Sequence, residues 1–369
     1  MKIGLITIHN VTNYGAILQA YATIQALSKY GDVTVINYQK NHLSHHMDLF
    51  RFKKSIRGIK MLGHDVLNFS SRSKMLSKFN KFIKQNMVLS EKVKREELLN
   101  KIDMGFDLYI CGSDQIWNPE IVSSKNILDP IFFLSFAPKG SKKISYASSI
   151  GHHQFTNSEK PKVKEWLEDF NKISIREADG RQKLLEILPD KKVQQVLDPT
   201  LLFSKEEWLQ KLNIPVKQPK EKYILVYSVP RTELIRKAIL FFSKKLNYKV
   251  YSIDKGLIPM QKVDNQINKA GPKDYIELFA NASFVITDSF HGLCFSINFE
   301  KPFAAISSKK VGNRQENLLE LMKIDDRLMR NEKDFYKLNT NLENVEGQRN
   351  ILRGLRENSL NYLESSIIS

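Results

Sequence analysis

The chain alternates strand-like and helix-like segments from its start, and this alternation restricts its fold more than any other feature. Residues 2–8 are apolar and strand-like, residues 10–15 form a polar turn, residues 16–30 have helical spacing, and residues 32–38 are again strand-like. A strand, a crossover helix and a second strand make a βαβ unit with parallel strands and a right-handed crossover. The turn at residues 10–15 is therefore expected at the carboxyl edge of a sheet, where open α/β folds bind ligands.

Two blocks of this alternation follow, with a basic insertion in the first and a polar connection between them. The expected strands are residues 106–111, 143–147, 172–175, 193–197, 223–229, 249–253 and 284–287. The expected helices are residues 159–171, 178–188, 232–246, 272–280, 293–299 and a terminal helix at 342–363. Strands that alternate with helices predict parallel sheets covered by helices. The expected fold class is α/β, with two doubly wound Rossmann-like domains and a C-terminal closing helix.

The domain division rests on residues 203–222, which are polar and carry prolines among lysines, as interdomain linkers do. We expect an N-terminal domain at residues 1–203, which includes the basic insertion at 51–101. A C-terminal domain is expected at residues 204–335. Residues 336–369 are expected to return as a helix toward the N-terminal domain.

Composition fits a soluble globular protein. Of the 369 residues 42% are hydrophobic, which is ample for buried cores. No apolar run approaches the roughly 20 residues that span a bilayer. Residues 1–8 lead into a turn, so a first strand is expected there and not a signal peptide. Cys111 and Cys294 lie in apolar runs, as buried thiols do in a reducing cytoplasm.

The charge is concentrated in one segment. The 57 Lys and Arg residues exceed the 40 Asp and Glu residues by 17, and residues 51–101 hold fourteen of the former against four of the latter, a net of +10. Within this segment apolar residues recur at helical spacing among basic ones, which is a basic amphipathic pattern. The apolar residues are Ile56, Ile59, Leu62, Val66 and Phe69, and the basic ones are Lys53, Lys54, Arg57 and Lys60. It predicts either a solvated basic surface or docking on an anionic membrane surface. Nucleic acid is not expected, because stacking aromatics do not interleave with the basic residues.

A His-Gly pair follows the expected strand at residues 284–287. The turn reads Asp288-Ser-Phe-His-Gly292 and leads into an apolar, helix-like run. The amides that open such a helix offer hydrogen bonds to an anion, and an imidazole beside them can move protons near neutral pH. His291 is therefore a candidate catalytic residue; the alternative is a histidine that only caps the helix. Asp288 is expected either to orient the imidazole or to cap the helix.

Six short segments occur in an order that resembles one known family. They are Asn10–Tyr21, Cys111–Pro119, Ser145–Gly151, Ser174–Glu177, Asp198–Leu201 and the segment Asp288–Gly292. Together they resemble the polysaccharide pyruvyl transferase family. The resemblance implies a glycosyltransferase-B-like fold and a transferase that moves the enolpyruvyl group of phosphoenolpyruvate to a sugar of a lipid-linked or polymeric saccharide. The product would be a pyruvate ketal in surface polysaccharide biosynthesis.

The resemblance also implies a donor site. Phosphoenolpyruvate carries a carboxylate and a phosphate, so its pocket needs cations or helix-terminus amides. Arg176, which stands in the family's Ser-x-Arg-Glu motif, is expected to be catalytic and to pair with the donor, because a guanidinium matches carboxylate and phosphate oxygens. The alternative is an ion pair with Glu177. His291 is the expected general acid.

The chain departs from the family beside that histidine, where other members have Arg-Leu and this sequence has Ser289-Phe290. Ser289 and Gly292 are expected to line the donor site without supplying a cation. Lys309 or Arg314, which follow shortly in the sequence, are expected to substitute for the missing arginine. The alternative is that both are surface charges.

The N-terminal domain is expected to bind the acceptor. The candidate residues are Asn13, Tyr14, Gly15, Ser113, Gln115, Trp117 and Asn118. They combine polar groups for sugar hydroxyls with an indole for the apolar face of a sugar ring. Asp114 is the expected base on an acceptor hydroxyl. The alternative is that Gly112 to Asp114 form an ordinary turn and that Trp117 lies in the core.

Neither a P-loop nor a Gly-x-Gly-x-x-Gly fingerprint is present, and no His, Asp or Glu cluster has metal-ligand spacing. No cofactor or metal is therefore expected, with phosphoenolpyruvate as a co-substrate. Two other functions stay open: a glycosyltransferase that uses a nucleotide sugar on the same fold, and a non-catalytic protein that binds saccharide or a lipid surface. The expected location is the cytoplasm, with attachment to the inner face of the cell membrane left open.

Overall fold

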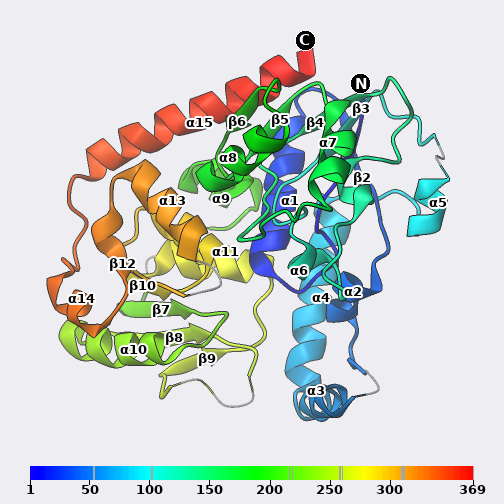
Figure 1. Ribbon diagram of the computed structural model, residues 1–369. Coiled ribbons are helices and arrows are strands. Elements are labelled where there is room, and N and C mark those ends of the chain that lie inside the picture. The colour runs from blue at the N-terminus through cyan, green and yellow to red at the C-terminus, as the bar shows by residue number, and fades with distance from the viewer. Residues whose placement is uncertain are drawn as a thin grey trace. The chain divides into compact units, whose positions relative to one another are not determined.

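The computed structural model describes residues 1–369 except 53–54, 101–102, 216, 218, 257–258, 260, 309–311 and 369. The chain forms two compact units, each built from separate stretches of sequence (Figure 1). The first unit comprises Met1–His46, Lys84–Leu202 and Arg353–Ser369, and the second comprises Met47–Ile83 and Phe203–Leu352. Boundaries fall inside the helices α4 (Phe69–Asn86) and α15 (Val345–Ile368), and another falls inside the short 3-10 helix η1 (His45–Met47).

The first unit contains a parallel sheet with the strand order β2-β1-β3-β4. Its strands are β1 (Lys2–Ile6), β2 (Asp32–Val35), β3 (Leu108–Cys111) and β4 (Lys142–Ser145). A parallel pair, β5 (Ile173–Ile175) and β6 (Val193–Gln195), is joined to β4 and its loop by the isolated bridges Ile144 to Lys172 and Ser148 to Ile175. The chain passes from β1 to β2 on one side and resumes with β3 on the other, so the strand order reverses between β1 and β3.

Helices cover this sheet. They are α1 (Tyr14–Leu27), α2 (Asn41–Ser44), η1 (His45–Met47), α5 (Arg95–Leu99), α6 (Pro119–Val122), η2 (Pro130–Phe133), α7 (Lys160–Glu168), α8 (Ala178–Ile187) and η3 (Pro199–Leu201). Helix α1 is buried on nearly all sides, as its mostly apolar and small residues predict, and the polar Gln19 and Thr23 are buried with them. Strand β3 is buried at every position, which is typical of a parallel strand with both faces covered.

The second unit contains a six-stranded parallel sheet with the order β12-β11-β10-β7-β8-β9. The strands are β7 (Tyr223–Tyr227), β8 (Lys249–Ile253), β9 (Asn265–Ile267), β10 (Phe284–Thr287), β11 (Phe303–Ile306) and β12 (Leu328–Met329). The helices are α3 (Ile56–Leu67), α9 (Lys205–Lys211), α10 (Glu233–Leu246), α11 (Pro272–Asn281), α12 (Phe290–Asn298), α13 (Gly312–Met322), η4 (Asp325–Arg327) and α14 (Glu332–Lys337). The strand order reverses between β7 and β10, so a ligand crevice is expected at their carboxyl ends.

The structure differs from the sequence-based division in the placement of residues 47–83, which belong to the second unit and not to the N-terminal half. Lys78 of α4 pairs with Asp274 of α11 at 2.7 Å, and the Lys78 side chain packs against Gly271. The predicted connection at residues 203–222 also contains helix α9. Its Trp208 is buried against Phe295, a contact that a polar sequence stretch did not indicate.

The end of α15 packs on the first sheet. The Tyr362 hydroxyl donates a hydrogen bond to the Ser145 carbonyl at 2.9 Å, and the Ser359 hydroxyl accepts one from the Leu197 amide at 2.9 Å. Leu363 is fully buried, whereas the adjacent Glu364 is exposed. The last turns of α15 are therefore part of the core of the first unit.

Removal of the Leu363 side chain tests this packing. We expect Leu363→Ala to lower the free energy of unfolding of the first unit by about 2–5 kcal/mol, because a buried leucine leaves a cavity. Glu364→Ala, one position along the same helix, is the control and should change it by less than about 0.5 kcal/mol. Urea unfolding of both variants makes the comparison. Equal stability of the two would show that the helix end does not pack as described.

Candidate functional site

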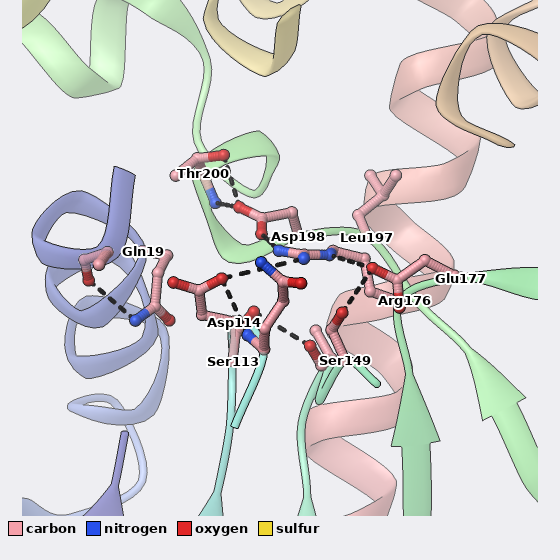
Figure 2. Close-up of polar contacts among 12 residues, drawn as sticks. Gln19, Ser113, Asp114, Ser149, Arg176, Glu177, Leu197, Asp198 and Thr200 are labelled. Atoms are coloured by element: carbon pink, nitrogen blue, oxygen red, sulfur yellow. Dashed lines mark hydrogen bonds and ion pairs between the residues drawn. The ribbon is translucent and has the colours of Figure 1, made fainter. Parts of the chain in front are cut away.

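Three strand ends of the first unit bring charged side chains to one edge of the sheet. Asp114 follows β3, Arg176 and Glu177 follow β5, and Asp198 follows β6. The carboxyl ends of parallel strands lie at the same edge. Figure 2 shows these four side chains gathered there, with the Arg176 guanidinium between the carboxylates.

Arg176 is buried and paired with carboxylates on several sides. Its Nη1 contacts Asp198, its Nε donates to Glu177 Oε1 at 3.0 Å, and its Nη2 lies 4.0 Å from Asp114 Oδ1. Burial opposes the charge, but the three carboxylates outweigh it and raise the pKa of Arg176. The guanidinium therefore stays charged and compensated by its own unit. The ion-pair alternative is therefore present, and it extends from Glu177 to the carboxylates of Asp114 and Asp198.

Further hydrogen bonds fix these carboxylates. Asp198 Oδ1 accepts from the Thr200 amide at 2.9 Å and from its hydroxyl at 2.6 Å. Glu177 Oε1 accepts from the Ser149 hydroxyl at 2.7 Å. Asp114 differs, because its side chain is 11% exposed whereas those of Glu177 and Asp198 are at most 1% exposed. Asp114 is thus the member of the cluster that a ligand could reach.

Trp117 lies in the core and does not present its ring to a ligand. Its indole N–H donates to the Phe132 carbonyl at 2.9 Å, and its ring stacks on Phe133 at a centroid distance of 5.2 Å. It has no exposed surface. The expected aromatic plate for a sugar is therefore wrong in this structure, and the core alternative holds.

The other predicted acceptor residues fall into two groups. Tyr14, Gly15, Ser113 and Asn118 are buried, whereas Asn13 is exposed and Gln115 is half-buried. Asn13 accepts from the Ala16 amide and caps α1, so its side chain is already engaged. Gln115 Oε1 accepts from Asn118 Nδ2 at 2.9 Å. Among the predicted acceptor residues, Asn13 and Gln115 are the ones with accessible polar surface, in addition to the partly exposed Asp114.

Gly112 explains the turn that carries Asp114. Its φ of +122° is a conformation that other residues avoid, and an added Cβ would lie 2.0 Å from the Tyr146 carbonyl oxygen. The glycine lets β3 and the β4 loop approach each other. The backbone conformation therefore explains the glycine of the Gly112-Ser113-Asp114 motif, whatever chemical role the motif has.

His9, which lies three residues after the end of β1 and directly after the expected strand at residues 2–8, was not predicted as a site residue. It is buried, and its ring nitrogens lie 3.1 Å from the Thr7 carbonyl oxygen and 3.3 Å from Asn37 Oδ1. Burial lowers its pKa, more than the two hydrogen bonds raise it. The position directly after the first strand was the signal for it. These contacts make His9 a structural link between β1 and the residues after β2.

The second unit places His291 in the first turn of α12, at the carboxyl edge between β7 and β10. The helix begins at Phe290, three residues before the expected start, and Ser289 is its N-cap, with its hydroxyl accepting from the Gly292 amide at 3.4 Å. His291 is buried. The prediction that His291 lies where a strand leads into a helix is confirmed, and the residue belongs to the first turn of the helix.

Gly292 permits a close approach of α12 to β10. An added Cβ would lie 2.2 Å from Thr287 Oγ1, and that hydroxyl is fixed because it donates to the Tyr227 carbonyl at 2.7 Å. The residue after His291 therefore has to be small. This gives the His-Gly pair a packing reason that holds the imidazole at the strand end.

Asp288 links the two strands on either side of the crossover point. It accepts from the Ser228 hydroxyl at 2.6 Å and from the Val229 amide at 2.8 Å, just after β7. Burial raises the pKa of Asp288, against the effect of these hydrogen bonds. Ser289, and not Asp288, caps α12. Asp288 thus has a third role, which neither expectation for it described.

Two residues, Lys309 and Arg314, were predicted as donor cations. Lys309 lies outside the described residues, whereas Arg314 lies within them. The Arg314 guanidinium carbon lies 5.6 Å from the centre of the Phe290 ring, next to His291, and the side chain is largely buried. Gln315, which was not predicted, follows it and is fully buried. Neither amide atom of Gln315 has a hydrogen-bond partner in the described part of the chain.

Two features of the described residues concern metal ions and membranes. In that part of the chain, no group of three or more His, Cys, Asp or Glu side chains is arranged to hold a metal ion. None of the helices described is long and apolar enough to cross a membrane.

Comparison with solved structures supports the fold. A structure of a proposed UDP-N-acetylglucosamine 2-epimerase from Listeria monocytogenes has 9% identity, covers 96% of this chain and 90% of its own, and gives a TM-score of 0.53. A UDP-GlcNAc 2-epimerase from Neisseria meningitidis, bound to UDP-GlcNAc, has 13% identity, covers 97% and 99%, and gives 0.44. The first of these likenesses supports two Rossmann-like units of the glycosyltransferase-B class, as predicted.

Comparison with protein families is more specific. No curated protein matches the chain. The family model for polysaccharide pyruvyl transferases matches residues 13–310, which include all but the first residues of the ordered motifs and extend through His291. The chain therefore belongs to the polysaccharide pyruvyl transferase family.

Proposed function

We propose that this transferase moves the enolpyruvyl group of phosphoenolpyruvate to a sugar of a lipid-linked or polymeric saccharide and closes a pyruvate ketal, in surface polysaccharide biosynthesis. The observation that carries the proposal is His291 in the first turn of α12, at the strand crossover of the second unit, in a chain of this family. That position combines a proton donor with the amides of a helix N-terminus.

The donor is an anion with a carboxylate and a phosphate of about −1.5 to −2. The first-turn amides of α12 and the Arg314 guanidinium beside Phe290 are the groups we assign to it. Ser289 and Gly292 shape the same turn. Arg314 takes the part that an arginine in place of Ser289 has in other family members, and guanidinium suits these oxygens.

The chemistry requires a proton on the methylene carbon of the donor while a sugar hydroxyl adds to the neighbouring carbon. His291 is the proposed acid for that step, and Asp114 of the first unit is the proposed base on the acceptor hydroxyl. A second hydroxyl of the sugar then bonds to the same carbon, and the bond between that carbon and the phosphate oxygen breaks. Phosphate leaves with the electron pair, the second hydroxyl loses its proton, and a cyclic ketal remains.

Arg176 has a positioning role in this proposal. It holds the carboxylates at the ends of β3, β5 and β6, and through that cluster it fixes Asp114. The accessible polar groups of Asn13 and Gln115 are assigned to the acceptor, together with Asp114.

The proposed place of action is the cytoplasmic face of the membrane, where a lipid-linked acceptor would be presented. The basic charge of residues 51–101 supports it, because polybasic segments are attracted to anionic lipid. No cofactor enters the proposed reaction, in which phosphoenolpyruvate is consumed.

Replacement of His291 is the direct test of the proposal. We expect His291→Ala to lower acceptor-dependent phosphate release from phosphoenolpyruvate by about 10²–10⁴-fold, because general acid catalysis is lost. The control is His46→Ala, which replaces an exposed histidine distant in sequence from His291 and should retain activity. Phosphate release is measured with and without saccharide acceptor. Undiminished turnover by a folded His291→Ala variant would refute the assignment.

Replacement of Arg314 tests the donor cation. Arg314→Met keeps much of the side-chain volume over Phe290 and removes the charge. We expect KM for phosphoenolpyruvate to rise at least tenfold, since a charge-assisted hydrogen bond contributes about 1.5–3 kcal/mol. KM for the acceptor should stay within about twofold. Arg330→Met, an exposed arginine that pairs with Glu316, is the matched control. A larger effect on the acceptor than on the donor would reject this role.

Replacement of Arg176 separates its positioning role from donor binding. Arg176→Met leaves three carboxylates without their cation, so we expect a loss of about 3–5 kcal/mol in unfolding free energy. Arg181→Met, which removes an exposed guanidinium bound to the Val193 carbonyl, should cost about 1 kcal/mol. Chemical denaturation gives both values. If Arg176→Met were as stable as the control yet raised KM for phosphoenolpyruvate tenfold, the arginine would bind the donor after all.

A further inference from the structure

Helix α3 turns its apolar side chains toward solvent. Ile56, Ile59, Val66 and Leu67 are 78%, 63%, 56% and 73% exposed. At 3.6 residues per turn these four lie on one side of the helix, which we call the α3 apolar face. Phe50 and Phe69, also exposed, stack on each other near the ends of this segment at a centroid distance of 5.9 Å.

The opposite side of α3 carries a buried charge. Asp65 accepts from the Arg51 amide at 2.9 Å and from Arg51 Nε at 3.0 Å, and Arg72 Nε of α4 lies 3.7 Å from it. Burial opposes ionisation of Asp65, but the hydrogen bonds and charges of the two arginines outweigh it and lower its pKa to about 2. The ion pair is thus formed at neutral pH.

This ion pair sets the rotation of the helix about its axis. To turn the α3 apolar face inward, the helix would have to release Asp65 from Arg51 and Arg72, and breaking a buried pair is strongly unfavourable. Arg72 is further held by a 2.8 Å hydrogen bond to the Leu49 carbonyl. The outward apolar face is therefore a fixed feature of the fold. Contiguous apolar surface of this kind marks an interaction site.

The surroundings of this face are strongly basic. Residues 47–86 contain ten Lys and Arg residues and two acidic residues, Asp48 and Asp65, a net of +8. Lys60 lies on the outward side of α3 itself, and Lys74, Lys81 and Lys84 of α4 are exposed. In Figure 1, α3 lies at the N-terminal end of α4. Apolar anchors beside a basic surface are the pattern of an interfacial, membrane-bound helix.

We propose that α3 docks on an anionic bilayer, with Ile56, Ile59, Val66 and Leu67 inserted at the boundary between headgroups and acyl chains. The docking deepens the proposed function, on which its purpose rests, because it would bring the enzyme to a lipid-linked acceptor. A second copy of the chain is a poorer occupant, since two segments of +8 would repel each other. An anionic membrane satisfies both the apolar face and the charge.

Vesicle sedimentation tests the docking. We use neutral phosphatidylcholine vesicles and vesicles that also contain phosphatidylglycerol, at physiological salt. The wild type should bind the anionic vesicles at least tenfold more strongly than the neutral ones. The double variant Ile59→Asp, Val66→Asp should lose at least tenfold in affinity for the anionic vesicles. Leu240→Asp, which alters a 54% exposed leucine of α10, is the matched control and should bind like the wild type.

Several results would overturn the docking. Unchanged binding by the double variant would show that the α3 apolar face is not inserted, and equal binding to both vesicle types would remove the role of charge. A dimer in solution without vesicles, abolished by the same two substitutions, would identify a second copy as the occupant. Phosphate release with a soluble acceptor fragment is measured in parallel. The double variant should lose vesicle binding and keep full turnover of the soluble acceptor. Failure of the wild type to release phosphate would contradict the proposed function but not the docking.

Discussion

The ion cluster around Arg176 is the interaction on which the carboxyl edge of the first sheet depends. Parallel strands bring their carboxyl ends to one edge, and contacts between the loops that follow them hold these loops together there. One buried guanidinium contacts carboxylates that follow β3, β5 and β6, and Ser149, after β4, is bound to the same cluster. The second unit uses a smaller version of the same device, in which Asp288 after β10 accepts two hydrogen bonds from residues after β7. In both units a buried carboxylate joins strand ends beside the point where the strand order reverses.

This arrangement assigns different tasks to the charged residues of the family motifs. Arg176 of the Ser-x-Arg-Glu motif contacts three carboxylates and so holds the strand ends together, and in our proposal it positions Asp114 and does not bind the donor. In our proposal, recognition of the anionic donor falls to the first turn of α12 and to Arg314. Gly292 matters here because only a residue without a side chain lets that turn lie against Thr287. The same glycine thus allows α12 to pack against β10 and places the amides of its first turn.

Much of this could be predicted from the sequence. The strand and helix alternation fixed the parallel sheets, and strand β10 was expected at its observed bounds, with His291 at the following turn. What sequence pattern could not predict is the direction in which a side chain points. Trp117 follows a polar turn and could equally face a ligand or the core, and the position of Phe132 and Phe133, distant in sequence, decided for the core. Arg176 was expected to serve a ligand because it ends a strand and stands in the Ser-x-Arg-Glu motif. Its contacts with Asp114 and Asp198, which are far from it in sequence, could not be predicted from a pattern. Short elements such as β11, β12 and α9 carry too few residues to show a period.

Helix α3 shows the same limit most clearly. Its apolar residues have the spacing of a helix that packs inward, and periodicity cannot distinguish such a helix from one rotated by half a turn. The rotation is decided by Asp65, a residue whose partners Arg51 and Arg72 lie outside the helix. The two components of the basic amphipathic pattern then act over different ranges. The lysines attract an anionic surface over a Debye length, about 8 Å at physiological salt, and this attraction weakens as salt is added. The apolar face acts only on contact and is insensitive to screening. A segment with both features is drawn to a membrane by charge and held there by insertion.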